Sequence, residues 1–167
     1  ALSGPAIWLY CVSLALGLVL AVVQFWLPGF TKTWPFLLHR STDRTAILAA
    51  KLTAAVAGFG LALGTAWIIL YAYASTPGVF PIPVPARIFA NGWIYMAWGL
   101  VAYLGTVLTG LSTARWYTTR VFGLVFAGVA VLAGSVDCTF FWACIIIVCT
   151  GVILLAQVCN AFLKREY

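Results

Sequence analysis

Five long runs of apolar residues constrain this chain more than any other feature of its sequence. A helix needs about 20 consecutive apolar residues to cross the hydrocarbon core of a bilayer. The runs are close to or above that length, and they cover about residues 6–26, 45–74, 89–111, 119–136 and 139–163. They predict an all-α integral membrane protein, in which residues 1–167 form a single transmembrane domain built as a bundle of about five helices.

The composition supports a membrane location. Hydrophobic residues make up 65% of the chain and charged residues only 7%, whereas a soluble protein carries roughly 25% charged residues to cover its surface. The mean hydropathy is +1.10. The formal net charge of +6 is therefore better interpreted as a topology signal than as a nucleic-acid site, and we expect no nucleic-acid partner. The sequence does not indicate which cell or organelle membrane holds the chain.

The last two runs must fold back on each other. A single helix from Arg120 to Leu163 would be about 66 Å long at about 1.5 Å per residue, twice the thickness of a bilayer core. The polar pivot between the two runs is Asp137-Cys138, which follows Gly134 and Ser135. We therefore expect the fourth and fifth helices to form a tight hairpin.

The basic residues predict the orientation. With five spans, one side of the membrane holds only Arg87 outside the apolar runs, and the other side holds Lys32, Arg40, Arg44, Arg115, Arg120, Lys164 and Arg165. Lysine and arginine collect on the side that is not translocated. The N-terminus is therefore expected outside and the C-terminus inside. The chain does not begin with methionine, so we expect it to be processed or part of a longer chain, and removal of a signal peptide fits an outward N-terminus.

The segment before the second span gathers an unusual share of the charge. Arg40 and Arg44 are expected among lipid headgroups at the inner surface, where anionic lipids attract basic side chains. Lys51 lies about two turns into the span and can extend its side chain back to that surface. Alternatively, Lys51 faces the interior of the bundle and binds a carboxylate, a phosphate or a lipid headgroup. His39 as a ligand is a third interpretation.

Gln157 and Asn160 form the best small polar patch inside the spans, because a spacing of three residues puts them on one face of the last helix. We expect this patch to contact a lipid headgroup or a partner.

Small residues recur every four residues along several spans. Such spacing lets helix backbones approach closely, which favours helix association in lipid. The stretches are Ser13-x-x-x-Gly17-x-x-x-Ala21, Ala50-x-x-x-Ala54-x-x-x-Gly58, Gly60-x-x-x-Gly64, Gly123-x-x-x-Ala127 and Ala130-x-x-x-Gly134. The second span carries small residues around most of its circumference. One face is enough for contacts within the chain, so we expect another face to meet a partner subunit.

The pattern of the five cysteines indicates structural side chains and not reactive or metal-binding ones. Most are expected to be buried as small hydrophobic side chains. Cys11 and Cys138 are both expected near the outer boundary, where an oxidising compartment would permit a disulfide between them. No pair has CxxC spacing, and no set has the spacing of zinc ligands.

The sequence lacks the usual signs of catalysis. It has a single histidine, no glycine-rich phosphate loop and no nucleophile motif. We therefore expect no catalytic residues, no metal site and no cofactor, and we do not expect an enzyme.

The leading hypothesis is a small multi-pass accessory or structural subunit of a larger membrane complex. Its partners would be other membrane subunits, bound through the small-residue faces, and lipids with anionic headgroups at the inner surface. One alternative is a component of a small oligomeric transporter or channel, with Lys51 or the Gln157–Asn160 patch lining the pore. Another is a membrane enzyme that handles a lipid or a quinone, with Lys51 and Arg44 holding a headgroup.

Overall fold

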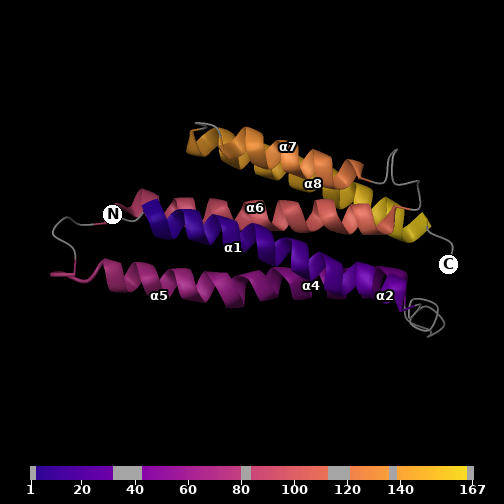
Figure 1. The fold of residues 1–167 in the computed structure, drawn as a ribbon, viewed down its shortest axis with the longest axis horizontal. Coiled ribbons are helices and arrows are strands. Elements are labelled where there is room, and N and C mark those ends of the chain that lie inside the picture. The colour runs from indigo at the N-terminus through magenta and orange to yellow at the C-terminus, as the bar shows by residue number, and fades with distance from the viewer. Residues whose placement is uncertain (1–2, 32–42, 80–83, 113–120, 136–138, 165–167) are drawn as a thin grey trace.

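The computed structural model describes residues 3–31, 43–79, 84–112, 121–135 and 139–164, and every regular element within these ranges is helical (Figure 1). The helices are α1 (Ser3–Ala21), η1 (Val22–Trp26), α2 (Leu27–Phe30), α4 (Arg44–Phe59), η2 (Gly60–Gly64), α5 (Thr65–Ala74), α6 (Ala86–Leu111), α7 (Phe122–Ser135) and α8 (Phe140–Lys164). The elements η1 and η2 are single π-helical turns. They continue the rods that run from α1 to α2 and from α4 to α5, so the chain is an all-α protein.

Four helical stretches are long and apolar enough to cross a bilayer, and they confirm an integral membrane protein. They are Ala6–Trp26, Arg44–Ala74, Ala86–Leu111 and Phe140–Leu163. The third begins earlier than expected, because Pro85 has the extended backbone of a helix N-cap and the helix starts directly after it.

The fifth expected span corresponds to α7, whose 14 residues give about 21 Å of helix. That is shorter than a bilayer core of about 30 Å, so a fifth crossing stays a prediction.

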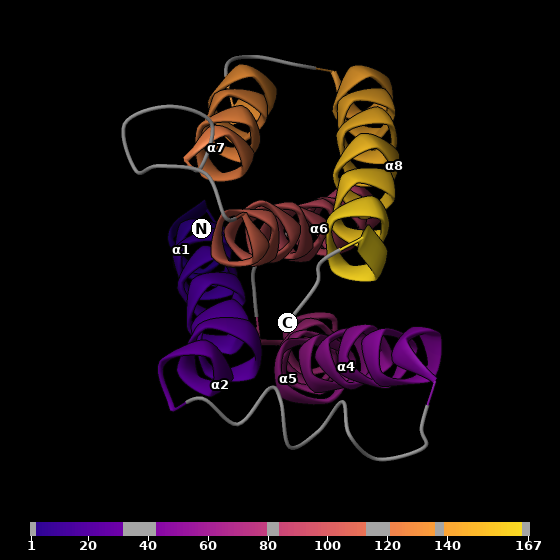
Figure 2. The ribbon, with the colours of Figure 1, turned by 90° about the vertical axis from the view of Figure 1, so that its right-hand side faces the viewer.

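The helix α6 is the centre of the bundle. In the most apolar part of α6, 61% of the residues are buried inside the protein. The corresponding share in the other three long spans is 17–22%. Figure 2 shows α1, α7 and α8 around α6, with the α4–α5 rod completing the bundle. Successive rods run in opposite directions (Figure 1). We call the end where α6 begins the Arg87 end, and the end where α4 begins the Arg44 end.

The helices α7 and α8 also run in opposite directions. Both pack against α6, and α7 ends at the Arg87 end, where α8 begins. The turn of the expected hairpin, residues 136–138, lies outside the described residues, so the tight hairpin stays a prediction.

The contact between α1 and α6 depends on the small residues that the sequence singled out on the first span. Ser13 and Ala21 are completely buried, and Gly17 is buried between them. The hydroxyl of Ser13 donates a hydrogen bond to the backbone oxygen of Tyr95 at 3.0 Å. A Cβ atom at Gly99 would lie 2.1 Å from Ser13 Oγ and 2.5 Å from Ser13 O. The two backbones therefore approach as closely as the spacing predicted.

A second close contact joins α6 to α7. A Cβ atom at Gly105 would lie 2.5 Å from the Cβ of Ala127 and 2.6 Å from the backbone oxygen of Gly123. The first N–H groups of any helix lack a partner within that helix. At α7 the backbone N–H of Leu124 donates to Thr109 Oγ1 of α6 at 3.0 Å. The small residues and this hydrogen bond together fix the start of α7 on α6.

The contact at Gly99 gives a first testable prediction. The substitution Gly99→Ala should destabilise the detergent-solubilised protein by about 1–3 kcal/mol, because the added methyl group meets Ser13 and has no space. The matched control is Gly128→Ala on α7, where a Cβ would have no neighbour within 4 Å. This control should be neutral or stabilising by up to about 1 kcal/mol, since alanine favours helix. The measurement is thermal unfolding followed by circular dichroism, and equal melting temperatures for the two variants would contradict the proposed contact.

Candidate functional site

Lys51 of α4 points toward the rod that contains α1 and η1. Its ammonium donates a hydrogen bond to the backbone oxygen of Gln24 and lies 4.9 Å from the centre of the Phe25 ring. A cation over an aromatic face gains further electrostatic stabilisation. The structure shows Lys51 in contact with a neighbouring helix of the same chain, and its binding to a carboxylate, a phosphate or a lipid headgroup stays a prediction.

The backbone of η1 explains why a carbonyl is available to Lys51. In an α-helix the carbonyl of Gln24 would accept from the N–H of the residue four positions later, which is Pro28 and has no N–H. The chain forms a π turn here, in which the N–H of Leu27 donates to the carbonyl of Val22 five residues earlier. Backbone carbonyls within a bilayer need hydrogen-bond donors from the protein, and Lys51 donates to this one from another helix.

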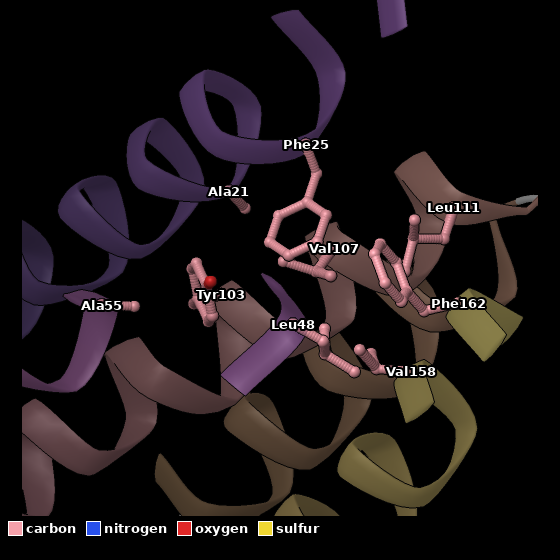
Figure 3. Close-up of a cluster of buried hydrophobic side chains, with 9 residues drawn as sticks. All are labelled: Ala21, Phe25, Leu48, Ala55, Tyr103, Val107, Leu111, Val158 and Phe162. Atoms are coloured by element: carbon pink, nitrogen blue, oxygen red, sulfur yellow. The ribbon is translucent and has the colours of Figure 1, made fainter. Parts of the chain in front are cut away.

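The side chain of Gln24 extends the contact to a third helix. The hydroxyl of Tyr103 on α6 donates to Gln24 Oε1 at 2.7 Å. Tyr103 is 2% exposed and belongs to a buried cluster at this end of the bundle (Figure 3). The cluster consists of Ala21, Phe25, Leu48, Ala55, Tyr103, Val107, Leu111, Val158 and Phe162. We call the set Lys51, Gln24 and Tyr103 the Gln24 link, because it joins η1, α4 and α6 by polar contacts inside an otherwise apolar region.

Sequence reasoning selected Lys51 but not its partners. Gln24 lies 27 residues from Lys51 and 79 from Tyr103 along the chain, so no local pattern joins them. One signal could have identified Gln24, because it is a polar residue inside an apolar run and lies four positions before a proline.

Of the other expected contact residues, the structure describes Arg44, Gln157 and Asn160, and none of these three belongs to the Gln24 link. Arg44 is the first residue of α4 and is exposed, and Arg40 lies outside the described residues. Gln157 and Asn160 are both exposed on α8, where they face away from the core. Contact of these four residues with lipids or partners stays a prediction.

The cysteines differ from expectation. None of the four that the structure describes is fully buried: Cys11 and Cys149 are exposed, and Cys144 and Cys159 are partly exposed, all as free thiols. The expectation of burial was wrong because, in a membrane, apolar side chains can face lipid and need no protein core. Cys138 lies outside the described residues, so its disulfide with Cys11 stays a prediction. Among the described residues, no three His, Cys, Asp or Glu side chains gather where they could hold a metal ion.

An apolar groove lies beside the Gln24 link, between α4, α6 and α8. Its volume is about 520 Å³, and its walls include Thr53 and Val56 of α4, Tyr103 of α6 and Leu155 of α8. The hydroxyl of Thr53 is bonded to the carbonyls of Ala49 and Ala50 in its own helix, so it offers the groove little polarity. The groove therefore suits a hydrocarbon chain.

No known protein family, no curated protein and no solved structure matches this chain. Its function is therefore inferred from its own residues and their geometry.

The Gln24 link gives a second prediction. The substitution Lys51→Met should destabilise the protein by about 1–3 kcal/mol, because it leaves the carbonyl of Gln24 without its donor. In a Pro28→Ala background the same substitution should cost much less, since residue 28 then has an N–H for that carbonyl. Unfolding of the four proteins in detergent measures this coupling as a double-mutant cycle.

The control for this cycle is Tyr103→Phe. It removes the hydrogen bond to the side chain of Gln24 but leaves the backbone carbonyl unchanged, so it should cost about 1 kcal/mol with or without Pro28. If Lys51→Met lowers the free energy of unfolding by the same amount in both backgrounds, the hydrogen bond from Lys51 does not compensate for the N–H that Pro28 lacks.

Proposed function

We propose that this chain is a small multi-pass accessory or structural subunit of a larger membrane complex, without catalytic chemistry of its own. The observation that carries the proposal is one face of α4, formed by Ala50, Ala54 and Gly58, which we call the α4 seam. Ala50 and Ala54 are exposed, and a Cβ atom at Gly58 would have no neighbour within 4 Å. The α4 seam therefore has no close neighbour within the described chain.

The other small-residue faces support this interpretation by contrast. Gly17 of α1 meets Gly99, Gly123 of α7 meets Gly105, and Gly134 of α7 meets the ring of Trp98. In each case the chain uses small residues to bring two of its own helices together. The α4 seam has the same spacing, and small residues in lipid gain from close packing against another helix. We assign that helix to a partner subunit.

Large exposed apolar side chains beyond the α4 seam on the same rod fit the same role. Leu61, one turn beyond Gly58, is 71% exposed, and Ile69 on α5 is 68% exposed. Protruding side chains beside small residues give a surface with ridges and a groove, which is the shape that helix packing requires.

The proposal includes a topology. The chain crosses the membrane five times, α7 and α8 form the hairpin, the N-terminus lies outside, and the Arg44 end faces the side that is not translocated. The distribution of lysine and arginine in the sequence supports this orientation.

The apolar groove favours a second candidate, a membrane protein that handles a lipid or a quinone. Its volume of about 520 Å³ and its hydrocarbon walls suit an acyl or isoprenoid chain, and Tyr103 of the Gln24 link is part of the wall. A bound chain would also be compatible with a structural subunit, so we rank this candidate second.

The α4 seam gives a third prediction. In the native membrane, Gly58→Leu should release the chain from larger assemblies, because the new side chain fills the groove that a partner helix would occupy. The matched control is Gly151→Leu on α8, where a Cβ would also have no neighbour within 4 Å. Gentle extraction, native-gel sizing and mass spectrometry identify what travels with each protein.

We expect the wild-type chain and the Gly151→Leu variant to migrate with the same set of larger proteins, and the Gly58→Leu variant to migrate alone while it keeps its melting temperature in detergent. Migration of the wild-type chain alone, or as a small homo-oligomer, would overturn the accessory-subunit proposal.

A further inference from the structure

A cavity with mixed polar and apolar walls lies at the Arg87 end, away from the Gln24 link. Its volume is about 320 Å³, and α1, α6, α7 and α8 all contribute to its walls. The polar side chains in these walls include Tyr10 of α1 and four residues of α6, namely Arg87, Asn91, Tyr95 and Trp98. The spacing of these four residues by four, four and three positions puts them along one face of α6. A single helix therefore presents most of the hydrogen-bonding groups of the cavity.

Trp98 is the residue in this set that most needs a ligand. It is 2% exposed, and within the described residues its indole N–H makes no hydrogen bond. The N–H groups of Trp26 and Trp67 donate to backbone oxygens of Thr106 and Phe89, each at 3.1 Å. A buried indole N–H normally has an acceptor, because it loses its bond to water on burial.

The indole of Trp98 lies against a wall of the cavity. Its Cε2 atom, which is bonded to Nε1, is 2.9 Å from the place of a Cβ atom at Gly134, and Gly134 also lines the cavity. The nearest atoms of the ring are Cζ2 and Cη2, at 2.0 and 2.4 Å from that position, so the absence of a side chain at Gly134 leaves room for the benzene edge of the indole beside the cavity.

Arg87 and Asn91 likewise have no partner among the described residues. Within the part of the chain that the structure describes, neither side chain makes a hydrogen bond or an ion pair. Arginine offers a planar set of donors that matches the oxygens of a phosphate or a carboxylate. Together with the indole N–H, the cavity therefore presents a positive charge and several donors to whatever it holds.

The remaining walls of the cavity are apolar. Ile7, Ile94 and Phe140 contribute hydrocarbon surface beside the polar face of α6. Arg87 is the second residue of α6, so the cavity lies where a transmembrane helix begins, at the depth where the headgroup of a lipid meets its chains. A free inorganic anion would leave these apolar walls uncovered, whereas an amphiphile covers them.

We propose that this cavity binds an amphiphile with an anionic phosphate or carboxylate head, which Arg87, Asn91 and the indole N–H of Trp98 hold by hydrogen bonds, while its hydrocarbon part lies along Ile7, Ile94 and Phe140. The inference does not depend on the accessory-subunit proposal, because it concerns the opposite end of the bundle and is tested on the purified chain.

The test uses the full chain in a neutral detergent, with phosphatidylglycerol as the probe. The lipid should raise the melting temperature, and native mass spectrometry should show it retained. Phosphatidylcholine with the same acyl chains should bind at least ten-fold more weakly, since its head is zwitterionic. Inorganic phosphate alone should give no comparable protection, because it has no hydrocarbon part.

The variants separate the groups that hold the head. The substitution Arg87→Gln should weaken binding of phosphatidylglycerol at least ten-fold, and Arg87→Lys should lose less, because the charge remains. The substitution Trp98→Phe removes the N–H and should weaken binding several-fold, and Asn91→Ala tests the same face of α6 if the Trp98 variant does not fold. The matched control is Trp142→Phe on α8, which is 58% exposed and should bind as the wild type does.

Three results would overturn the proposal. One is equal binding of the two phospholipids, and another is unchanged affinity for phosphatidylglycerol in the Arg87→Gln and Asn91→Ala variants. The third is protection by inorganic phosphate alone that equals protection by the lipid, which would identify the ligand as a free anion.

Discussion

The close approach of α6 to its neighbours is the constraint on which the rest of the structure depends. Lipid removes most of the hydrophobic incentive for helices to associate, so contact must come from packing. Glycines make that packing possible in two ways. Gly99 and Gly105 let the backbone of α6 contact the neighbouring helices directly. Gly92 and Gly110 leave space for the rings of Trp67 and Trp26, which pack against the backbone of α6. A helix with larger residues at these positions would hold its neighbours too far away to form the core.

The sequence predicted the outline of the bundle well, because apolar length and small-residue spacing are local signals. It located the four long spans and the close contacts of Ser13 and Gly17. It did not identify the glycines of α6, because their role depends on rings and backbones that come from distant parts of the chain. The sequence also predicted more buried cysteines than the structure has. In a membrane span, an apolar residue that faces lipid cannot be told from one in the protein core by its residue type.

The candidate sites were predicted less well than the fold. Lys51 was selected as an unusual charge, but its acceptor is a backbone carbonyl, which no side-chain pattern reveals. The polar face of α6 was available to sequence reasoning, since Arg87, Asn91 and Trp98 repeat with helical spacing. From the sequence, Arg87 was used only to assign topology, so it was not joined to Asn91 and Trp98 as one face. That the buried N–H of Trp98 has no acceptor among the described residues becomes apparent only when burial and hydrogen bonds are known.

The contact between Lys51 and Gln24 has a consequence for how the protein is made. The first span is synthesised before α4, and during that interval the carbonyl of Gln24 has neither the N–H that Pro28 lacks nor the ammonium of Lys51. The arrival of α4 therefore adds a donor to a carbonyl of the first span, at a depth where water does not supply one. This hydrogen bond thus favours an approach of α4 to the first span during synthesis, while the main packing partner of α1 is α6, which is made later.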